Sequence, residues 1–264
     1  MSFRVLAVDG EERGDIGGSG TETCAVILSG GGAVFEAGSD RFELAGRATV
    51  FDAKPWAIYV PDGCHGHLAA QPVGGASHVV VAVAEALSSG REGVAMQPVV
   101  ISPDDVEVEI RGAGDATRRI HHIIKPEFAA DRLEVVEVYT PAGNWSSWPP
   151  HKHDVDDMPA EAVLEEIYYY QQRRRDGWGI QRLYRREGDR RDGVWAVRHG
   201  ELVLVTDGYH PFVASHGYDA YYLNALAGDR RTMACTDDPD LAWTRAAWSD
   251  MVVDPRAAAM VSES

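Results

Sequence analysis

The chain has 264 residues, and its 41 Asp and Glu outnumber its 25 Lys and Arg, which gives a formal net charge of -16. Because nucleic acids reward basic surfaces, this balance argues against DNA or RNA as the main partner, and equally against a polybasic membrane-surface protein. No apolar stretch approaches the roughly 20 residues that span a bilayer, so no membrane segment is expected. The length fits one large domain or two small ones, and 45% hydrophobic residues suffice for a core.

The N-terminus and the cysteines indicate a cytoplasmic protein. Residues 1–5 show no apolar run that ends in a cleavage site, so no secretory signal is expected. The three cysteines, Cys24, Cys64 and Cys235, are far apart and odd in number, which does not resemble a disulfide framework. We expect them to be small buried or half-buried residues in a reducing compartment.

Short apolar runs separated by Gly, Pro and Asp predict a β protein with two strand-rich halves. The strands expected in the first half cover 24–29, 33–35, 48–51, 56–60 and 78–82. Those expected in the second half cover 133–139, 165–171, 178–184, 194–197, 200–205 and 218–226. A short helix is expected over 240–251. The small, polar segment 112–117 predicts a linker, with domains 1–116 and 117–264 folded as two small β-barrels or sandwiches.

The candidate chemistry lies in the second half. His151 and His153 are two residues apart, so on a strand they point to the same side and can hold one metal ion together. Glu165 and Glu166 offer carboxylates on the next expected strand, and His210 follows an Asp-Gly turn. Three imidazoles and one carboxylate suit Zn, Mn, Fe, Co or Ni, with positions left open for substrate. Alternation along the strand does not choose between the two glutamates.

Other histidines need the same scrutiny, because an isolated H-x-H pair is more often exposed or structural. Cys64-His65-Gly66-His67 contains a second such pair, but no well-spaced acid and third histidine accompany it. We therefore expect a loop or barrel-rim cluster there. His121 and His122 are adjacent, so at most one of them faces a site on a strand.

The sequence segments around these histidines resemble those of a known family. The five stretches are GNWSSWPPHKHD (143–154), LEEIYY (164–169), GYHP (208–211), HGYD (216–219) and YYLNALAG (221–228). They are similar to the 5-deoxy-glucuronate isomerases of myo-inositol catabolism, which are related to the 5-keto-4-deoxyuronate isomerases of pectin breakdown. The strong resemblance covers about 133–248. Tyr170 and Thr206 depart from the family, which often has His and Pro there; these departures concern substrate detail more than the metal.

The resemblance implies an all-β bicupin, in which two tandem jelly-roll-like cupin barrels form a degenerate N-terminal domain and a metal-binding C-terminal domain. It implies a single metal site with the ligands His151, His153, Glu166 and His210. Glu166 is preferred because it directly precedes Ile-Tyr, the place that the related family uses. One divalent ion is implied, with Zn or Mn the first choice and Fe, Co or Ni as alternatives.

The implied reaction is an aldose–ketose isomerisation of 5-deoxy-D-glucuronate to 5-dehydro-2-deoxy-D-gluconate. A Lewis acid would stabilise the enediolate, and a base must act within hydrogen-bond reach of the substrate. The candidates for the base are Lys152, Tyr218, Tyr222, His216 and the non-liganding oxygen of Glu166. Lys152 lies between two ligands, so we expect it to point away from them. Tyr218 and Tyr222 share a strand face with Asn224 and could line the pocket, or they could pack as aromatic core.

The substrate carboxylate calls for an arginine, which binds it through two parallel hydrogen bonds. Arg182 is the predicted partner because it lies on an expected strand beside Gln181. The arginines at 173–175 and 190–191 are expected in solvated turns. A negative net charge does not forbid an acidic substrate, because the local field matters more than the total.

Three other functions are compatible with the same residues. They are a 5-keto-4-deoxyuronate-type isomerase, an Fe(II) cupin dioxygenase with the same ligand set, and a non-catalytic cupin that binds sugar acids. A small sugar acid is the expected partner. A homo-oligomer is also expected, because barrels of this kind often pair their edge strands.

Overall fold

The computed structural model describes residues 1–71, 78–188 and 191–261, and nearly all of its regular structure is β-strand. This confirms the all-β prediction. The helical segments are α1 (Trp243–Ala246), η1 (Ala247–Asp250) and η2 (Pro255–Ala259), of which the first two lie in the helix expected over 240–251. None of the helices in the described part of the chain combines the length and the apolar character that crossing a bilayer requires.

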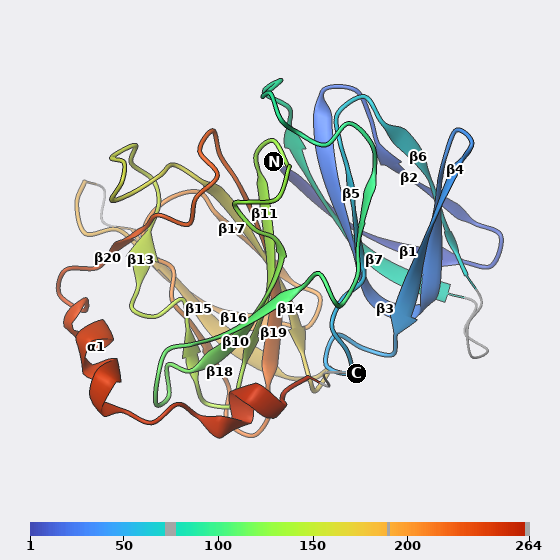
Figure 1. Cartoon of the computed structure of the whole chain (residues 1–264). Helices are drawn as coiled ribbons and strands as arrows, with labels where there is room; N and C mark the ends of the chain where they lie inside the picture. Colours follow the sequence, from blue (N-terminus) through green and yellow to red (C-terminus); the bar gives the residue numbers. More distant parts are fainter. Residues whose placement is uncertain (72–77, 189–190, 262–264) are drawn as a thin grey trace. The chain divides into compact units, whose positions relative to one another are not determined.

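The chain divides into two compact units (Figure 1). The first consists chiefly of Met1–Glu107 and Ile123–Val135, and the second of Val108–His122 and Val136–Met260. The expected linker 112–117 joins two neighbouring strands of one sheet, β9 (Glu107–Arg111) and β10 (Arg118–Ile124). The boundary near 116 stays a prediction.

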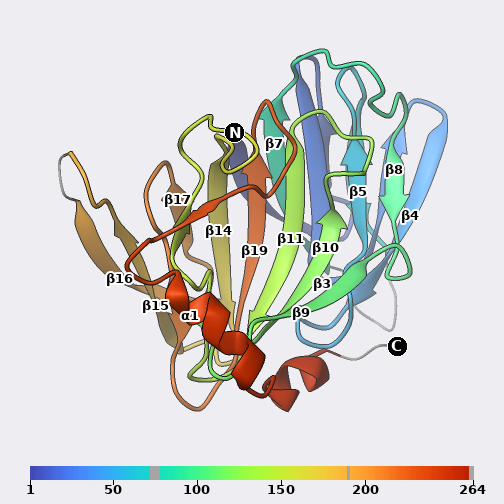
Figure 2. The same cartoon turned by 60° about the vertical axis from the view of Figure 1, so that its left-hand side comes forward.

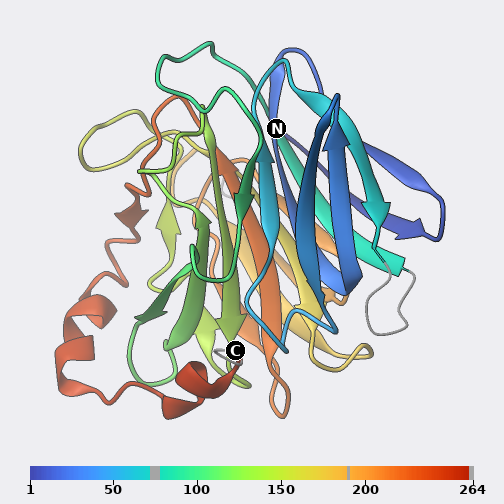
Figure 3. The same cartoon turned by 45° about the vertical axis from the view of Figure 1, so that its right-hand side comes forward.

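The first unit carries an eight-stranded sheet with the order β1-β7-β3-β5-β8, in which β4 and β6 also pair with β3, and β2 with β6 (Figure 3, blue to cyan). Its strands are β1 (Ser2–Asp9), β2 (Arg13–Gly17), β3 (Thr21–Ala37), β4 (Asp40–Arg47), β5 (Ala57–Val60), β6 (His65–Ala70), β7 (His78–Leu87) and β8 (Val99–Ile101). Its core is aliphatic, with Phe35 as the one fully buried aromatic ring among the clustered residues.

The long strand β3 replaces two strands expected from the sequence. Residues 21–30 pair with β7 and residues 33–36 pair with β6, so the strand changes partner at its Gly30–Gly32 run. Gly30 has φ +116°, and a Cβ there would lie 2.3 Å from the carbonyl oxygen of His78. The glycines therefore bend the strand without ending it, which a turn-based reading of three glycines does not anticipate.

The second unit contains three sheets. The first has the order β17-β14-β19-β11-β10-β9 (Figure 2). The second has the order β12-β18-β15-β16, and the third pairs β13 with β20. The strands not yet given are β11 (Leu133–Thr140), β12 (Trp145–Ser146), β13 (His151–Lys152), β14 (Glu165–Gln172), β15 (Trp178–Tyr184), β16 (Asp192–Arg198), β17 (Leu202–Val205), β18 (Phe212–Ala214), β19 (Ala220–Ala227) and β20 (Thr236–Asp237). In the described strand pairings none of these sheets closes into a barrel.

The core of this unit lies between the six-stranded and the four-stranded sheets. Tyr168, Tyr170 and Tyr222 from the first pack with Val197 and Phe212 from the second. Since alternate residues of a strand share a face, the same inner face also receives polar side chains farther along β14, β19 and β10. Those side chains build the site.

Candidate metal centre

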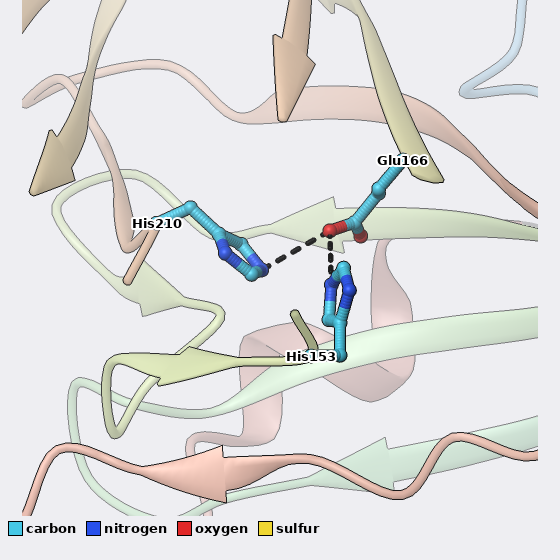
Figure 4. Close-up of side chains that lie close together, drawn as sticks. All are labelled: His153, Glu166 and His210. Carbon is cyan, nitrogen blue, oxygen red and sulfur yellow. Dashed lines mark hydrogen bonds and ion pairs between the residues drawn. The ribbon is translucent and has the colours of Figure 1, made fainter. Parts of the chain in front are cut away.

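Three buried side chains meet at one end of this inner face. His153 follows β13, Glu166 lies on β14, and His210 lies between β17 and β18. The ligand atoms that they offer all lie within 4.8 Å of one another. Glu166 Oε2 lies 2.7 Å from His153 Nε2 and 3.1 Å from His210 Nε2 (Figure 4). The structure thus brings together three of the four predicted ligands.

His151, the fourth predicted ligand, lies next to this group. Its ring centroid is 4.8 Å from that of His210 and 6.5 Å from that of His153. It lies on β13, which pairs with β20 in the register His151 to Asp237. Both His151 and His153 line the same cavity, so they share a side as their spacing predicts.

Each of the three imidazoles is held by its Nδ1 atom. His151 Nδ1 lies 3.1 Å from the carbonyl oxygen of Pro149, His153 Nδ1 lies 3.0 Å from that of Leu164, and His210 Nδ1 lies 2.9 Å from that of Gly208. A carbonyl oxygen only accepts, so each Nδ1 carries the proton that it donates. The Nε2 atoms are therefore the ones left to bind a metal, as is usual for histidine ligands fixed by an outer hydrogen bond.

The Nε2 atom of His210 is buried and has no hydrogen-bond partner among the described residues. It faces Glu166 Oε2, which is 3.1 Å away but not in hydrogen-bonding geometry. With the proton on Nδ1 alone, an imidazole lone pair would face a carboxylate oxygen, a repulsive arrangement that a second proton on Nε2 or a metal cation between the two atoms relieves. The donor set thus fits a divalent metal ion on chemical grounds, with nitrogen and oxygen ligands of the kind that Zn and Mn accept.

Glu166, rather than Glu165, is the acid that meets the imidazoles. Glu165 is exposed, whereas Glu166 is 4% exposed. Asn224 Nδ2 on β19 donates to Glu166 Oε1 at 2.7 Å, which turns Oε2 toward the histidines. Asn224 was predicted only as a lining residue. Its orienting role depends on the register between β14 and β19, which local sequence does not contain.

The charges of the group depend on one another. Burial lowers the pKa of His151 well below its ordinary value, with the neighbouring His210 adding to the effect, so this ring is neutral. Burial opposes the charged form of His153 as well, yet the Glu166 carboxylate beside it holds the His153 pKa above its ordinary value. Burial also opposes ionisation of Glu166, but His210 and His153 hold its pKa well below the usual range. The carboxylate is therefore ionised and available as a ligand.

Among the predicted catalytic residues, Tyr222 also reaches the cavity. It is 2% exposed, and its ring centroid lies 4.7 Å from that of Tyr168 and 5.7 Å from that of Phe212. Tyr222 therefore both packs in the aromatic core and lines the pocket. Burial raises its pKa, so its hydroxyl keeps its proton at neutral pH.

Tyr218 and Arg182 are not brought to the cavity. The hydroxyl of Tyr218 bonds the backbone N and O of Trp178 at 2.9 and 3.0 Å, because Tyr218 precedes the start of β19 and does not follow its alternation. Arg182 binds Asp192 at 2.7 and 2.8 Å, and its side chain is 42% exposed. Gln181 beside it points inward, so Arg182 points outward. His216 lines a separate surface pocket with Tyr218.

Lys152 points away from the imidazoles, as predicted. Its Nζ donates to Asp154 at 2.7 Å and to both oxygens of Glu161 at 2.8 and 3.0 Å. The other oxygen of Asp154 accepts from the backbone N of Gly208 at 2.8 Å. Lys152 thus helps to hold the turn that carries His210, which is a positioning role.

Replacing Lys152 by methionine is expected to weaken metal binding about 10-fold, because outer partners of ligands are worth 10–100-fold in affinity. Competition with a chromophoric chelator measures this. Lys125→Met is the matched control, since Lys125 makes an exposed ion pair with Glu107. Equal metal affinity in both variants would refute the positioning role.

His121 and His122 lie as their adjacency predicts, whereas residues 65–67, expected in a loop or barrel-rim cluster, lie on strand β6. His121 is buried beside Arg119 and Glu137, whereas His122 lines the cavity and binds Glu109 at 3.0 Å. Only one of the adjacent pair therefore faces the site. In the first half, the side chains at 65 and 67 are exposed on β6. Within the described chain, the three residues of Figure 4 are the only cluster of at least three His, Cys, Asp or Glu side chains whose ligand atoms lie close enough together to hold a metal ion.

Packed β-sheets and a buried His/Glu/His group define the chain as an all-β protein with a candidate metal centre. The KduI/IolB family model matches residues 1–244, and the chain belongs to this family.

Curated relatives and solved structures agree with this assignment. The chain is 43% identical over 225 residues to the 5-deoxy-glucuronate isomerase of Geobacillus kaustophilus, with 84% of this chain and 77% of the relative covered. It is 38% identical to that of Listeria monocytogenes, with 85% and 80% covered. An IolB-like protein from Salmonella typhimurium has a TM-score of 0.84 at 34% identity, with 92% and 89% covered. Lactobacillus farciminis oxalate decarboxylase, at 9% identity and TM-score 0.58 over 88% and 78%, shares the fold alone.

Proposed function

We propose that the protein is a metal-dependent aldose–ketose isomerase that converts 5-deoxy-D-glucuronate to 5-dehydro-2-deoxy-D-gluconate in myo-inositol catabolism. One observation carries the metal dependence. The Nδ1 atoms of three imidazoles all donate to backbone carbonyl oxygens, and their rings lie beside an ionised, buried Glu166. The relatives named as 5-deoxy-glucuronate isomerases support the substrate and the reaction. We also propose the bicupin architecture, with tandem barrels over 1–116 and 117–264.

His151, His153, Glu166 and His210 would hold one divalent ion, with Zn or Mn preferred. When bound, such an ion supplies a Lewis acid for the adjacent oxygens of an aldose or ketose. Glu166 contributes a ligand charge that Asn224 keeps in place through its other oxygen. Because these ligand side chains are already held in place, they need not reorganise during the reaction. Such preorganisation is the main source of electrostatic catalysis.

Tyr222 would act as a hydrogen-bond donor to a substrate oxygen. Its buried hydroxyl keeps its proton because burial raises its pKa, so it is not suited to remove the proton from C2. Tyr168 packs against it and donates to or accepts from Ser147 Oγ at 2.8 Å, which fixes this wall of the cavity. Both tyrosines exclude water from the ligands.

A direct assay tests this function. Purified protein is expected to carry about one divalent ion per chain and to consume the aldehyde of 5-deoxy-glucuronate in an NMR time course. Prolonged dialysis against a chelator should abolish turnover, and readdition of Zn or Mn should restore it. Full activity in metal-free protein would refute the metal dependence, and oxygen consumption without isomerisation would point to a dioxygenase instead.

We further propose that the protein is a cytoplasmic homo-oligomer. All three cysteines are free, which suits a reducing compartment. β16 and β17 lie at the ends of their sheets and expose Trp195 and Leu204, which are 48% and 58% accessible. Exposed apolar side chains on edge strands favour association between copies. Light scattering coupled to gel filtration measures the mass, and a monomer at micromolar concentration would exclude the oligomer.

A further inference from the structure

The cavity that contains the candidate metal centre also has a cationic wall. Arg111 on β9 and Arg245 on α1 both line it. Arg111 binds Glu109 through two bonds of 2.6 and 2.7 Å, and Arg245 binds Asp237 through two bonds of 2.7 Å. Each of these guanidinium charges is thus already matched by a carboxylate in fork geometry.

A third arginine in the cavity, Arg118 at the start of β10, is not matched in this way. It is 4% exposed, and its Nη1 donates to the carbonyl oxygen of Ala116 at 3.1 Å. Its guanidinium carbon lies 5.6 Å from the ring centroid of Trp248. Within residues 1–71, 78–188 and 191–261, no carboxylate forms an ion pair with it.

The charge on Arg118 survives its burial. Burial lowers the pKa of Arg118 to about 10, with the nearby Arg111 adding to the effect, so the side chain is still protonated at neutral pH. A buried charge is ordinarily paired, because leaving it alone carries a large desolvation penalty. A cavity-lining guanidinium that forms no ion pair with a carboxylate of the described residues is therefore arranged to receive an anion from outside the protein.

Arg118 and Glu166 face the same cavity from strands β10 and β14. The sheet order places β11 and β19 between these two strands, so their axes are about 14 Å apart at the usual strand spacing. Tyr222 lies on β19, one of the two strands between them, and both charges affect its pKa, which Arg118 lowers and Glu166 raises after the larger effect of burial. The cavity thus offers metal ligands from β14 and its neighbours, a hydroxyl donor from β19 and a cation from β10, two strands beyond β19.

We propose that Arg118 binds the carboxylate of the sugar-acid substrate and makes the enzyme prefer acids to neutral sugars, an assignment that rests on the proposed isomerase function. An open-chain sugar acid carries its carboxylate at the end opposite the carbons that react, which matches this layout. The planar guanidinium offers two parallel hydrogen bonds to such a group. Arg182, predicted for this role from the sequence, instead donates two hydrogen bonds to Asp192 at the surface.

The test compares 5-deoxy-glucuronate with its uncharged C6 carboxamide. Arg118→Met is expected to lower kcat/KM for the acid about 100-fold, mostly through KM, because a desolvated charged hydrogen-bond pair is lost. The carboxamide should change by less than about threefold, since it brings no charge to be paired. Arg118→Lys should fall between, because it keeps the charge but not the fork. Arg174→Met is the control, as Arg174 is 65% exposed and paired with Asp176.

Metal content and melting temperature of each variant separate binding from folding. Equal losses for acid and carboxamide, with metal retained, would assign Arg118 a structural role and overturn the proposal. The proposal would also be overturned if Arg182→Met, and not Arg118→Met, lost the preference for the acid over the carboxamide. If the metal-loaded wild type converts neither compound, the isomerase function fails, and calorimetry with the acid and its carboxamide on wild type and Arg118→Lys then decides whether the anion site exists. Should Arg118→Met not fold, the Arg118→Lys comparison carries the test alone.

Discussion

His210→Ala is expected to remove the metal ion and to lower turnover about 1000-fold, since a Lewis acid is worth several kcal/mol of barrier and 1.36 kcal/mol is a factor of ten. The Nε2 atom that is lost has no hydrogen-bond partner among the described residues, so the substitution sacrifices no hydrogen bond on that side of the ring. The variant should therefore fold with its sheets intact. Elemental analysis of purified protein and the NMR assay measure the two effects.

His67→Ala is the matched control, because His67 lies on β6 with an exposed side chain that binds Asp15. It should leave metal content and turnover unchanged. A His210→Ala protein that keeps one ion per chain and normal turnover would show that the three-residue group is not the metal centre.

Glu22→Gln is expected to cost about 3–5 kcal/mol of unfolding free energy in the first unit, because it breaks a buried charged network. Glu22 on β3 is fully buried and accepts backbone N–H bonds from Asp131, Arg132 and Leu133 at 2.6–2.7 Å. It also accepts from the Tyr59 hydroxyl at 2.6 Å. A glutamine would turn an NH2 group toward these donors, leaving at least one buried N–H without an acceptor.

Urea unfolding followed by far-UV circular dichroism measures the loss. Glu36→Gln is the control, since Glu36 makes exposed ion pairs with Arg13 and Arg41 that contribute little to stability. A Glu22→Gln protein as stable as Glu36→Gln would show that the three amides find other acceptors. Because Glu22 lies outside the unit that carries the candidate ligands, metal content of the folded variant should stay normal.

The candidate histidine ligands could be predicted from the sequence because their signals are local. His151 and His153 lie two apart at a short strand, and His210 follows a Gly turn, so spacing alone indicates a shared side. The choice of Glu166 over Glu165 came from a family resemblance, since alternation leaves both open until the register of β14 against β19 is known.

Arg118 was missed for the opposite reason. Its stretch reads as the end of a linker followed by two histidines, yet residues 118–124 form a buried strand in which Arg118, Ile120 and His122 all line the cavity. The available signal was the spacing of Arg118, Ile120 and His122, which are two residues apart and therefore share one face of a strand. It does not show which neighbours already carry a carboxylate partner, and that is what separates Arg118 from Arg111 and Arg245.

Sequence by itself determined the β class, the three candidate histidines with two candidate glutamates, and the family resemblance, because strand periodicity, turn residues and short motifs are local properties of the chain. The tertiary structure decided what depends on contacts between distant strands: the bend that makes β3 one strand, the acid that faces the imidazoles, and the cavity arginine that forms no ion pair with any described residue. Pairing and burial are set by strand order and register, and no residue carries that information in its immediate neighbours.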